Sequence, residues 1–531
     1  MDVPLSPLRF KGRALSLYGS KSAIVCGDLR FTYAEFFGRC DRLSRLLGSL
    51  GIGRGDRVAF LAFNCHRLLE AYYGVVQAGA VLLPMNVRLA GSEFEFILND
   101  SGSRVLFFDP ELKDAIAAIR PRLETVEHYV PLQPSGRDHW TTSKSYDELL
   151  AESEEAPYNF SVPDEDEVAE LFYTSGTTGN PKGVMLTHRN LYLHALATII
   201  AMATRDSDVH LHTIPLFHVN GWGAPQTVTC MGGTHVMLRK FDPGQVFRLI
   251  TRESVSCMSL VPTMATALLN HPDVGNGTFP SMRLITLGGA APSQLMVEKV
   301  ERAFGCACMT GYGLSETSPV LSLASPKDGF KALTTSERWS RQAMTGIPLV
   351  GVEIRVVDEN DQDVPSDGKA IGEVIVRSDH VMKGYWRQPG DTAHALRNGW
   401  FHTGDMATLD EEGYLLIVDR KKDIIISGGE NIASVEIEKC LAQHPAILEC
   451  AVIPVPDPQW GEVPKALVVL QSDMRASEDE ILAYCRKTLA GFKCPGSVDF
   501  METLPKGGTG KILKRTLRER YWTSQSRRVQ G

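Results

Sequence analysis

Residue types suited to phosphate binding gather in one glycine-rich segment, Tyr173–Gly183 (YTSGTTGNPKG). Its glycines let the backbone curl so that successive N–H groups point at one spot and bind anionic oxygens. The Ser and Thr hydroxyls add donors, and Lys182 adds a positive charge. Pro181 excludes a Walker A loop, which needs glycine before the lysine. The segment predicts a polyphosphate site, with a flexible surface loop as the alternative. The residues in this prediction are Thr174, Ser175, Gly176, Thr177, Thr178, Gly179 and Lys182.

A second segment, Thr310–Thr317 (TGYGLSET), combines an aromatic ring with a carboxylate. Tyr312 lies between two glycines, which leaves its ring open for a nucleobase to stack on. Glu316 offers a hard oxygen ligand of the kind that Mg²⁺ takes beside substrate phosphates. By itself the segment is also explained as a turn with a capping Ser and Glu.

Two further segments carry charges next to glycine turns. Gly399–Asp405 (GWFHTGD) ends in a carboxylate that can accept two ribose hydroxyls, and Arg420 in the downstream DRKKD run can reach phosphate or ribose oxygens. Leu504–Ile512 (LPKGGTGKI) places Lys511 at the end of a glycine-rich loop. Each segment alone also fits a hairpin turn or a solvated surface loop.

In this order and spacing the four segments resemble the AMP-forming adenylating superfamily. That superfamily comprises acyl-CoA synthetases, adenylation domains of nonribosomal peptide synthetases and firefly-type luciferases. The resemblance extends from about Tyr33 to Arg515, and it includes the run DRKKDIIISGGENI. The segment Pro215–Gly223 (PLFHVNGWG) is similar to bacterial fatty-acid–CoA ligases and to the related methylthiopropionate–CoA ligases.

The resemblance implies an ATP-dependent carboxylic acid–CoA ligase that uses ATP, Mg²⁺ and CoA. Such an enzyme activates a fatty or other apolar acid to acyl-AMP and transfers the acyl group to CoA, releasing AMP and pyrophosphate. Several alternatives stay open. They are an acyl-adenylating enzyme that loads a carrier protein, a ligase specific for methylthiopropionate or an aryl acid, an oxidative luciferase-like enzyme, and an adenylate-binding regulator without catalysis.

The resemblance also implies a role for each motif residue. Lys511 becomes the catalytic lysine of adenylation, Lys422 the hinge between two domains, and Glu316 with Thr174 the site that places Mg²⁺. The residues implied to bind ATP or CoA are Thr174, Ser175, Gly176, Thr177, Thr178, Gly179, Lys182, Gly289, Ala290, Ala291, Thr310, Gly311, Tyr312, Ser315, Asp405, Arg420, Ser427, Gly428 and Gly429.

The implied acid site consists of His218, Val219, Trp222 and Gly288. His218 and Trp222 are four residues apart, so a helix here would place them on one side. The alternative is an ordinary core aromatic residue and a hydrogen-bonded histidine. The segments 218–223, 261–264 and 288–291 contain no Arg or Lys for a second carboxylate, which favours an apolar monocarboxylic acid.

Strand–turn–helix repetition predicts the elements that position these motifs. Arg57–Phe63 is typical of a strand, Leu68–Gln77 of a helix and Ala80–Pro84 of the next strand. This alternation indicates an α/β fold with largely parallel sheets. Between about 345 and 420 the pattern changes to short alternating strands, which indicates a β subdomain.

The predicted fold class is therefore α/β, with a large N-terminal domain of stacked α/β subdomains plus a β subdomain over residues 1–421. Residues 422–531 are predicted to form a small mobile α+β C-terminal domain. Its expected elements are a helix near 434–443, strands at 449–454 and 465–471, and a helix at 478–489. The N-terminal domain is expected to bind ATP and the acid, and the C-terminal one to carry the catalytic lysine and the CoA passage.

Composition narrows the class of protein and its partners. The 531 residues are 43% hydrophobic and 22% charged, which is ordinary for globular domains and excludes a disordered chain. Lys+Arg 55 against Asp+Glu 63 gives a net charge of −8, which argues against broad nucleic-acid binding. The partners that the resemblance implies are small molecules: the carboxylic acid, ATP and CoA. The sequence leaves the oligomeric state open, a homodimer included.

The cysteines and the apolar runs indicate where in the cell the protein is expected. The 11 cysteines are odd in number and spread along the chain, which is typical of reduced thiols in the cytoplasm. No uninterrupted apolar run of 18 residues occurs, so we expect no integral membrane segment. The N-terminal residues lack the apolar stretch of a signal peptide.

Overall fold

The structure is a computed structural model that describes residues 3–134, 140–160, 164–174, 180–421, 423–427, 430–506 and 512–522. The chain divides into two compact units. The first comprises Met1–Glu353 with Arg377–Phe401, and the second comprises Ile354–Val376 with His402–Gly531. The domain boundary predicted between residues 421 and 422 concerns a hinge at Lys422, which lies outside the described residues, so it stays a prediction.

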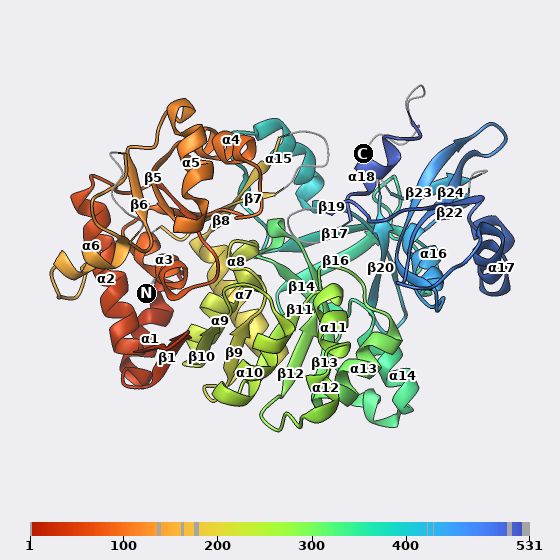
Figure 1. The fold of residues 1–531 in the computed structure, drawn as a ribbon, viewed down its shortest axis with the longest axis horizontal. Helices are drawn as coiled ribbons and strands as arrows, with labels where there is room; N and C mark the ends of the chain where they lie inside the picture. The colour runs from red at the N-terminus through yellow and green to blue at the C-terminus, as the bar shows by residue number, and fades with distance from the viewer. Residues whose placement is uncertain are drawn as a thin grey trace. The chain divides into compact units, whose positions relative to one another are not determined.

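The first unit contains a sheet with the order β15-β14-β13-β12-β11-β9-β10-β1-β2. Strands β13 to β1 of this order are parallel, whereas β2, β14 and β15 pair antiparallel at the edges. The strands are β1 (Ser22–Cys26), β2 (Leu29–Thr32), β9 (Val209–His212), β10 (Thr234–Met237), β11 (Cys257–Leu260), β12 (Leu284–Leu287), β13 (Ala307–Gly313), β14 (Val320–Leu323) and β15 (Ile347–Pro348). Helices α10 to α13 lie alongside this sheet in Figure 1, as a parallel sheet requires.

A second sheet of the same unit has the order β18-β8-β7-β4-β3-β5-β6. Its strands are β3 (Arg57–Leu61), β4 (Val81–Pro84), β5 (Ser103–Phe108), β6 (His128–Pro131), β7 (Val168–Thr174), β8 (Lys182–Thr187) and β18 (Gly384–Tyr385). Strands β7 to β6 of this order are parallel, and β8 and β18 are antiparallel. The predicted strand–helix–strand sequence is confirmed by β3, α3 (His66–Gln77) and β4.

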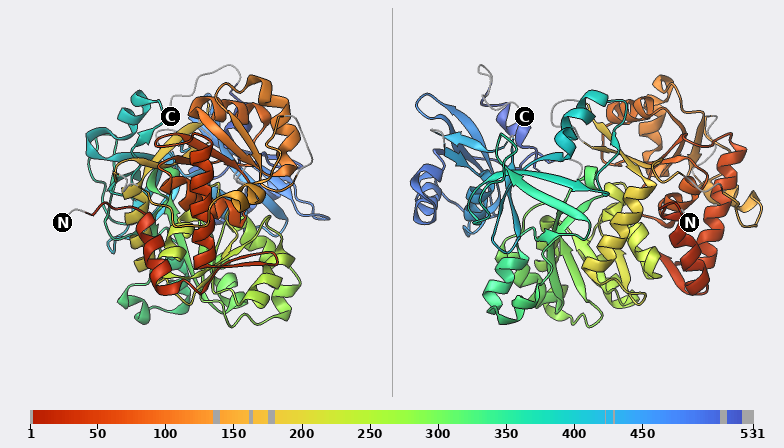
Figure 2. Two further views of the ribbon diagram at one scale, coloured as in Figure 1. Left: turned by 90° about the vertical axis from the view of Figure 1, so that its left-hand side faces the viewer. Right: turned by 180° about the vertical axis from the view of Figure 1, so that it is seen from behind.

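Helices cover the faces of both sheets, and Figure 2 shows the N-terminal helices from behind. Besides α3, those of the first unit are α1 (Leu8–Tyr18), α2 (Tyr33–Ser49), α4 (Gly91–Ser101), α5 (Lys113–Ile119), α6 (Tyr146–Glu152), α7 (His188–Met202), α8 (Val219–Trp222), α9 (Ala224–Met231), α10 (Pro243–Glu253), α11 (Pro262–Leu269), α12 (Asp273–Asn276), α13 (Gln294–Phe304), α14 (Thr335–Gln342) and α15 (Pro389–Ala395). Local sequence explains where several of them begin. The Thr32 side chain and Glu35 form a capping box for α2, and Asp242 caps α10 just before Pro243.

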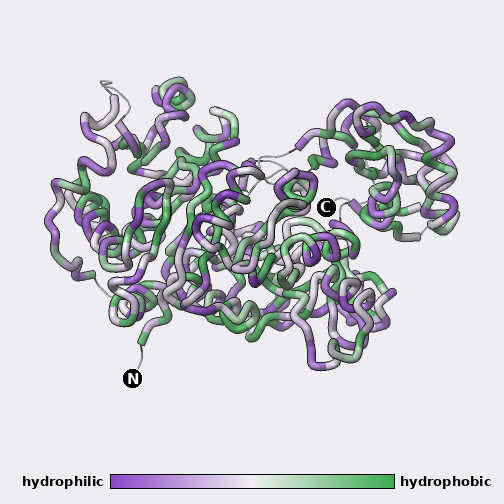
Figure 3. Tube along the Cα trace, turned by 60° about the horizontal axis from the view of Figure 1, so that its bottom comes forward, coloured by the Kyte–Doolittle hydropathy of each residue, from purple (hydrophilic) through white to green (hydrophobic). Residues whose placement is uncertain are grey.

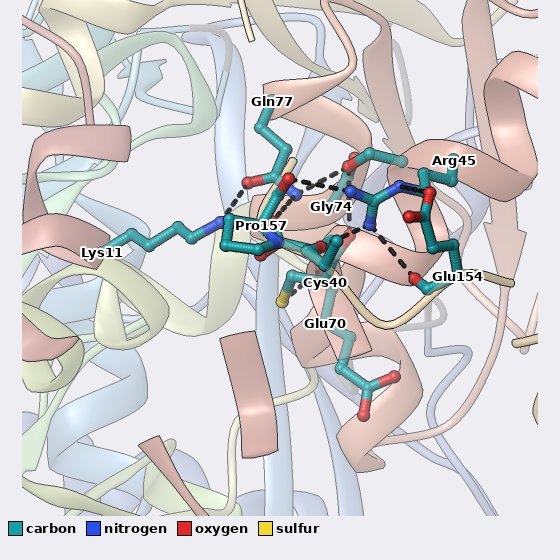
Figure 4. A network of polar contacts seen from close by, with 11 residues as sticks. Lys11, Cys40, Arg45, Glu70, Gly74, Gln77, Glu154 and Pro157 are labelled. Carbon is teal, nitrogen blue, oxygen red and sulfur yellow. Dashed lines mark hydrogen bonds and ion pairs between the residues drawn. The ribbon is translucent and has the colours of Figure 1, made fainter. Parts of the chain in front are cut away.

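A polar network fastens the N-terminal helices to one another (Figure 4). Lys11 of α1 donates to Gln77 of α3 at 2.8 Å and forms an ion pair with Asp41 of α2. Arg45 of α2 donates to the Pro157 carbonyl at 2.8 Å. Because its buried groups are paired, this network holds the helical layer without leaving a charge unsatisfied.

The second unit contains two further sheets. One has the order β16-β17-β19-β20 and consists of β16 (Val352–Val357), β17 (Gly372–Ser378), β19 (Phe401–Leu409) and β20 (Leu415–Arg420). It confirms the run of short strands predicted between about 345 and 420, and most of this sheet belongs to the second unit rather than to a domain with residues 1–353. The other has the order β22-β21-β24-β23, with β25 beside β24, and consists of β21 (Ile425–Ser427), β22 (Glu430–Ile432), β23 (Ile447–Asp457), β24 (Gly461–Leu470) and β25 (Ser497–Phe500). With α16 (Ser434–Leu441), α17 (Glu478–Thr488) and α18 (Lys514–Arg518), it confirms the predicted α+β pattern.

Each unit has its own hydrophobic core. In the first unit, one cluster packs around β9 to β13 and another around β3 to β5. The second unit packs its helices α16 and α17 on one face of the β23–β24 pair. Figure 3 shows hydrophobic stretches of the chain alternating with hydrophilic ones along the Cα trace. Among the described residues, no helix has both the length and the apolar character needed to cross a membrane.

Candidate active site

Glycines lie at the carboxyl ends of two neighbouring parallel strands: Gly288 and Gly289 follow β12, and Gly311 lies near the end of β13. Leu260, Leu287 and Thr310 are register partners across these strands, so the residues just after them lie side by side. Gly288 follows Leu287, and its N–H donates to the Leu260 carbonyl at 3.1 Å. Ligands of open α/β sheets bind at this edge. The structure thus brings the predicted residues Gly288, Gly289 and Gly311 to one edge of the sheet.

The indole of Trp222 covers this edge. A Cβ added to Gly288 would lie 2.9 Å from the Trp222 ring, and one added to Gly289 would lie 3.8 Å from it. No side chain fits at Gly288 without moving the indole. Val261, the residue after β11, also meets Gly289, at 3.2 Å from the added Cβ. The predicted acid-site residues Trp222 and Gly288 are therefore in contact.

The helical arrangement expected for His218 and Trp222 is wrong. Val219, Asn220, Gly221, Trp222 and Gly223 all have positive φ, with values of 42°, 40°, 53°, 62° and 81°. The segment is a left-handed turn, although it carries the label α8, so a spacing of four does not place side chains on one helical face. His218 precedes the turn in an extended conformation.

The predicted phosphate loop is flanked by two paired strands. β7 ends at Thr174 and β8 begins at Lys182, and these two residues are register partners. The Lys182 ammonium lies 2.6 Å from the Asp391 carboxylate and 5.2 Å from the centre of the Tyr385 ring. Lys182 is thus held at the mouth of the predicted loop by a charge and an aromatic face.

Tyr385 links this lysine to the predicted magnesium ligand. Its hydroxyl donates to the Glu316 carboxylate at 2.9 Å. The Met382 N–H donates to the Glu316 carbonyl at 2.8 Å, and β18 pairs Tyr385 with Val184 of β8. The segment containing Met382 and Tyr385 therefore fixes Glu316 beside the phosphate strands.

Tyr385 and Asp391 are site residues that the sequence reasoning missed. They lie about 200 residues after the phosphate segment, and only the aromatic run KGYW after a turn marks the region in the sequence.

The residues predicted to frame adenine have contrasting environments. Gly289 and Ala290 are exposed and Ala291 is half-buried, so their backbone is open to a ligand. Thr310 and Ser315 are buried, and the Thr310 hydroxyl has no hydrogen-bond partner among the described atoms. A buried hydroxyl of this kind at a strand end suits a ligand that completes its hydrogen bonding. Tyr312 is half-buried on β13 next to Gly311.

In the second unit the structure pairs Asp405 with Arg420. They are register partners on β19 and β20, and the Arg420 Nε lies 2.7 Å from the Asp405 carboxylate. The Asp405 side chain is only 5% exposed. Ser427 ends β21 at a hairpin with β22. A carboxylate fixed by a guanidinium can accept two hydroxyls without rearranging.

Several predicted residues lie outside the described part of the chain, and their roles stay predictions. They are Ser175, Gly176, Thr177, Thr178, Gly179, Lys422, Gly428, Gly429 and Lys511.

Two family models match the chain. The one described as AMP-binding enzyme matches residues 13–386, and the one described as AMP-binding enzyme C-terminal domain matches residues 436–511. Together they cover the segments that carry the phosphate and lysine motifs, and the ribose motif with Asp405 and Arg420 lies between the two matched ranges.

Relatives named as CoA ligases or CoA synthases match over nearly the whole chain. A long-chain-fatty-acid–CoA ligase of Thermus thermophilus is 39% identical over 529 residues, covering 98% of this chain and 96% of the relative. A feruloyl-CoA synthase of an Amycolatopsis species is 39% identical over 504 residues, covering 94% and 96%. The solved structure of ATP-bound MatB from Rhodopseudomonas palustris superposes with a TM-score of 0.86 at 32% identity, covering 97% of this chain and 99% of that one.

Proposed function

Because the chain belongs to the AMP-forming acyl-CoA synthetases of the adenylate-forming superfamily, we propose that this carboxylic acid–CoA ligase prefers an apolar monocarboxylic acid. The acid carboxylate attacks the α-phosphate of ATP, which forms acyl-AMP and releases pyrophosphate. The CoA thiol then attacks the acyl carbon, which forms the thioester and releases AMP.

The observation that carries the proposed acid class is the contact of Trp222 with Gly288. The indole presents an apolar surface at the carboxyl edge of the sheet, and Val261 lies beside it. A cavity of about 40 Å³ adjoins the indole and is lined by Arg283, among other residues. Arg283 is ion-paired with Asp208 at 2.7 Å, so its charge is already neutralised. A second carboxylate on the substrate would therefore be buried against apolar groups, which is unfavourable.

The adenylation step has a largely electrostatic barrier, because it brings a carboxylate to a triphosphate. We assign Lys182 and the loop after Thr174 to the phosphates, with Asp391 releasing Lys182 as a phosphate takes its place. Lys511 is assigned to the transferring α-phosphate. Asp405 is assigned to the ribose hydroxyls with Arg420 beside it, and the remaining adenine and α-phosphate assignments follow the sequence prediction.

Glu316 and Thr174 offer the hard oxygen donors that suit Mg²⁺. The described residues contain no cluster of three or more potential metal ligands, which agrees with a cation bound mostly through phosphates. When bound, Mg²⁺ supplies positive charge that offsets charge on the departing pyrophosphate. Tyr385 positions the Glu316 carboxylate by its hydrogen bond at 2.9 Å.

The thioester step uses residues of the second unit in this proposal. Ser427, Gly428 and Gly429 line the pantetheine passage, where glycines leave room for a narrow thiol arm. Lys422 is the hinge that lets the C-terminal domain turn between the two steps.

We also propose a cytoplasmic location, because all eleven cysteines, which are among the described residues, are free thiols. A homodimer remains a hypothesis that sedimentation would test.

The acid class is tested with acid-dependent pyrophosphate–ATP exchange. Each apolar monocarboxylic acid is compared with a dicarboxylic acid of the same chain length. We expect the monocarboxylic acids to exceed their partners in kcat/KM by about 100-fold or more, the scale of burying one unpaired charge. Preference for the dicarboxylic acids would overturn the proposed acid class.

A further inference from the structure

A buried carboxyl group lies directly behind the left-handed turn that carries Trp222. Glu170, on β7, is fully buried. The Asn220 amide lies 3.2 Å from one of its oxygens and the Gln226 amide 2.8 Å from the other. Its register neighbours on β4 and β8 are Leu82 and Leu186, so the group meets apolar strands on both sides.

Asn220 connects this carboxyl group to the backbone of the turn. Its Nδ2 faces Glu170, and its Oδ1 accepts the Gly223 N–H at 2.7 Å. The side chain thus spans the turn and ties its far end to β7. Positive φ is unfavourable for a β-branched residue such as Val219 and for Trp222, so surrounding contacts must hold these residues in place.

We propose that Glu170 is a positioning residue that holds the turn 219–223 in its left-handed form and thereby fixes Trp222 against Gly288 and sets the acid preference. The inference rests on the proposed function in one respect, the assignment of Trp222 to the acid site. Glu170 itself touches neither acid nor nucleotide in this proposal; it acts through Asn220.

Glu170 suits this role as a neutral carboxyl group. Burial raises the pKa of Glu170 to about 8. The groups that face it are the two amides, from α8 and α9, and Tyr72 of α3, whose own pKa is raised by burial and by the Glu170 charge. None of these groups is charged near pH 8.

The orientation of the Gln226 amide decides whether it can accept the proton of a protonated Glu170. The Gln226 Oε1 is buried without a partner among the described atoms. With that amide turned over, its oxygen takes the position 2.8 Å from Glu170 and accepts the carboxyl proton.

This arrangement has a defined pH dependence. Below pH 8 the protonated carboxyl group keeps both amide contacts. Above it, the buried carboxylate is charged, and burial disfavours that charge more than the two amide hydrogen bonds favour it. The site is then driven to rearrange so that water reaches the carboxylate, which displaces the turn packed on it. The acid KM should then rise about tenfold for each pH unit above the pKa, as expected when one protonated group is required.

The test compares Glu170→Gln with the wild-type protein in pyrophosphate exchange between pH 6.5 and 9.5. Glutamine keeps the shape and the hydrogen bonds but does not ionise. We expect its acid KM to stay flat across this range, while the wild-type acid KM rises above pH 8 and the MgATP KM of both proteins changes in parallel.

Two variants separate positioning from general stability. Glu70→Gln alters another fully buried glutamate, one paired with Arg39 at 2.6 Å, and should keep the wild-type pH profile. Asn220→Gly accepts positive φ more easily than asparagine but loses the link to Glu170, so it should raise the acid KM at pH 7 without changing the MgATP KM.

Two outcomes would contradict the inference. Identical acid-KM profiles for wild type and Glu170→Gln, with exchange active, would overturn the role of Glu170 alone. Absence of acid-dependent exchange from the folded wild-type protein would overturn the proposed function and this inference with it.

Discussion

Gly288→Ala is a direct probe of the contact between the sheet edge and Trp222. The added Cβ would lie 2.9 Å and 3.1 Å from two carbons of the indole and 3.3 Å from the Gly311 carbonyl oxygen. Carbon atoms at van der Waals contact are about 3.5–4.0 Å apart, so the indole has to retreat by about 0.6–1 Å.

Such overpacking typically costs about 1–3 kcal/mol. If the same free energy is lost from the transition state that contains the acid, kcat/KM falls by about 5- to 150-fold. We expect that loss for acids whose acyl group contacts the indole. In a Trp222→Ala background the Cβ has no indole to meet, so the same glycine substitution should cost little there.

The assay is pyrophosphate exchange with a series of acids, measured for both single variants and the double variant. The cycle should give a coupling free energy of about 1–3 kcal/mol, as expected for residues in contact. Gly12→Ala is the matched control, because a Cβ at Gly12 meets nothing within 4 Å. Equal losses from Gly288→Ala in both backgrounds would refute the contact between Gly288 and Trp222 as a determinant of acid preference.

Three further predictions concern other parts of the structure. Tyr385→Phe removes the hydrogen bond to Glu316 and should raise the MgATP KM about tenfold, the scale of a hydrogen bond to a charged group, while leaving the acid KM unchanged; equal shifts in both KM values would contradict the assignment. Arg39→Ala leaves the buried Glu70 without the guanidinium that lies 2.6 Å from it, and should lower the free energy of unfolding by about 3–5 kcal/mol in urea denaturation. A loss below about 1 kcal/mol would contradict a stabilising role for this ion pair. Burial lowers the pKa of His210 and of His380 to about 4 and that of His235 to about 3, so the unfolded chain binds protons first as the pH falls below about 6.5. The free energy of unfolding should therefore fall between about pH 6.5 and pH 4, by about 1.4 kcal/mol per pH unit for each histidine. Urea midpoints that are equal at pH 7 and pH 5 would contradict this prediction.

The regular elements were predictable from the sequence because their apolar periodicity matches their burial. β3 is apolar after Arg57, and α3 is buried along its whole length. The helices α16 and α17 begin and end close to the expected residues. Here local pattern and tertiary structure agree.

The turn that carries Trp222 was not predictable in the same way. A spacing of four between His218 and Trp222 suggests a helix face, but the backbone is left-handed because Glu170 and Gly223 hold Asn220 and because Gly288 leaves room for the indole. Tertiary contacts override the local preference of these residues.

The site roles of Tyr385 and Asp391 could not be predicted from the sequence for a related reason. Their roles depend on the pairing of β18 with β8, which joins strands about 200 residues apart, and no local pattern encodes that pairing. Glu170 was hidden in a different way, since a single carboxyl group within an apolar strand carries no motif.

The two-step ligase chemistry is tested most directly by measuring AMP, pyrophosphate and acyl-CoA together in one reaction. The purified protein is supplied with ATP, Mg²⁺ and an apolar monocarboxylic acid, with and without CoA. With CoA we predict equal amounts of AMP, pyrophosphate and acyl-CoA. Without CoA we predict acid-dependent pyrophosphate exchange but little net AMP release, and Lys511→Ala should suppress that exchange by about 100-fold or more. AMP release that does not depend on CoA, or thioester formation that requires a carrier protein, would contradict the assignment as an acid–CoA ligase.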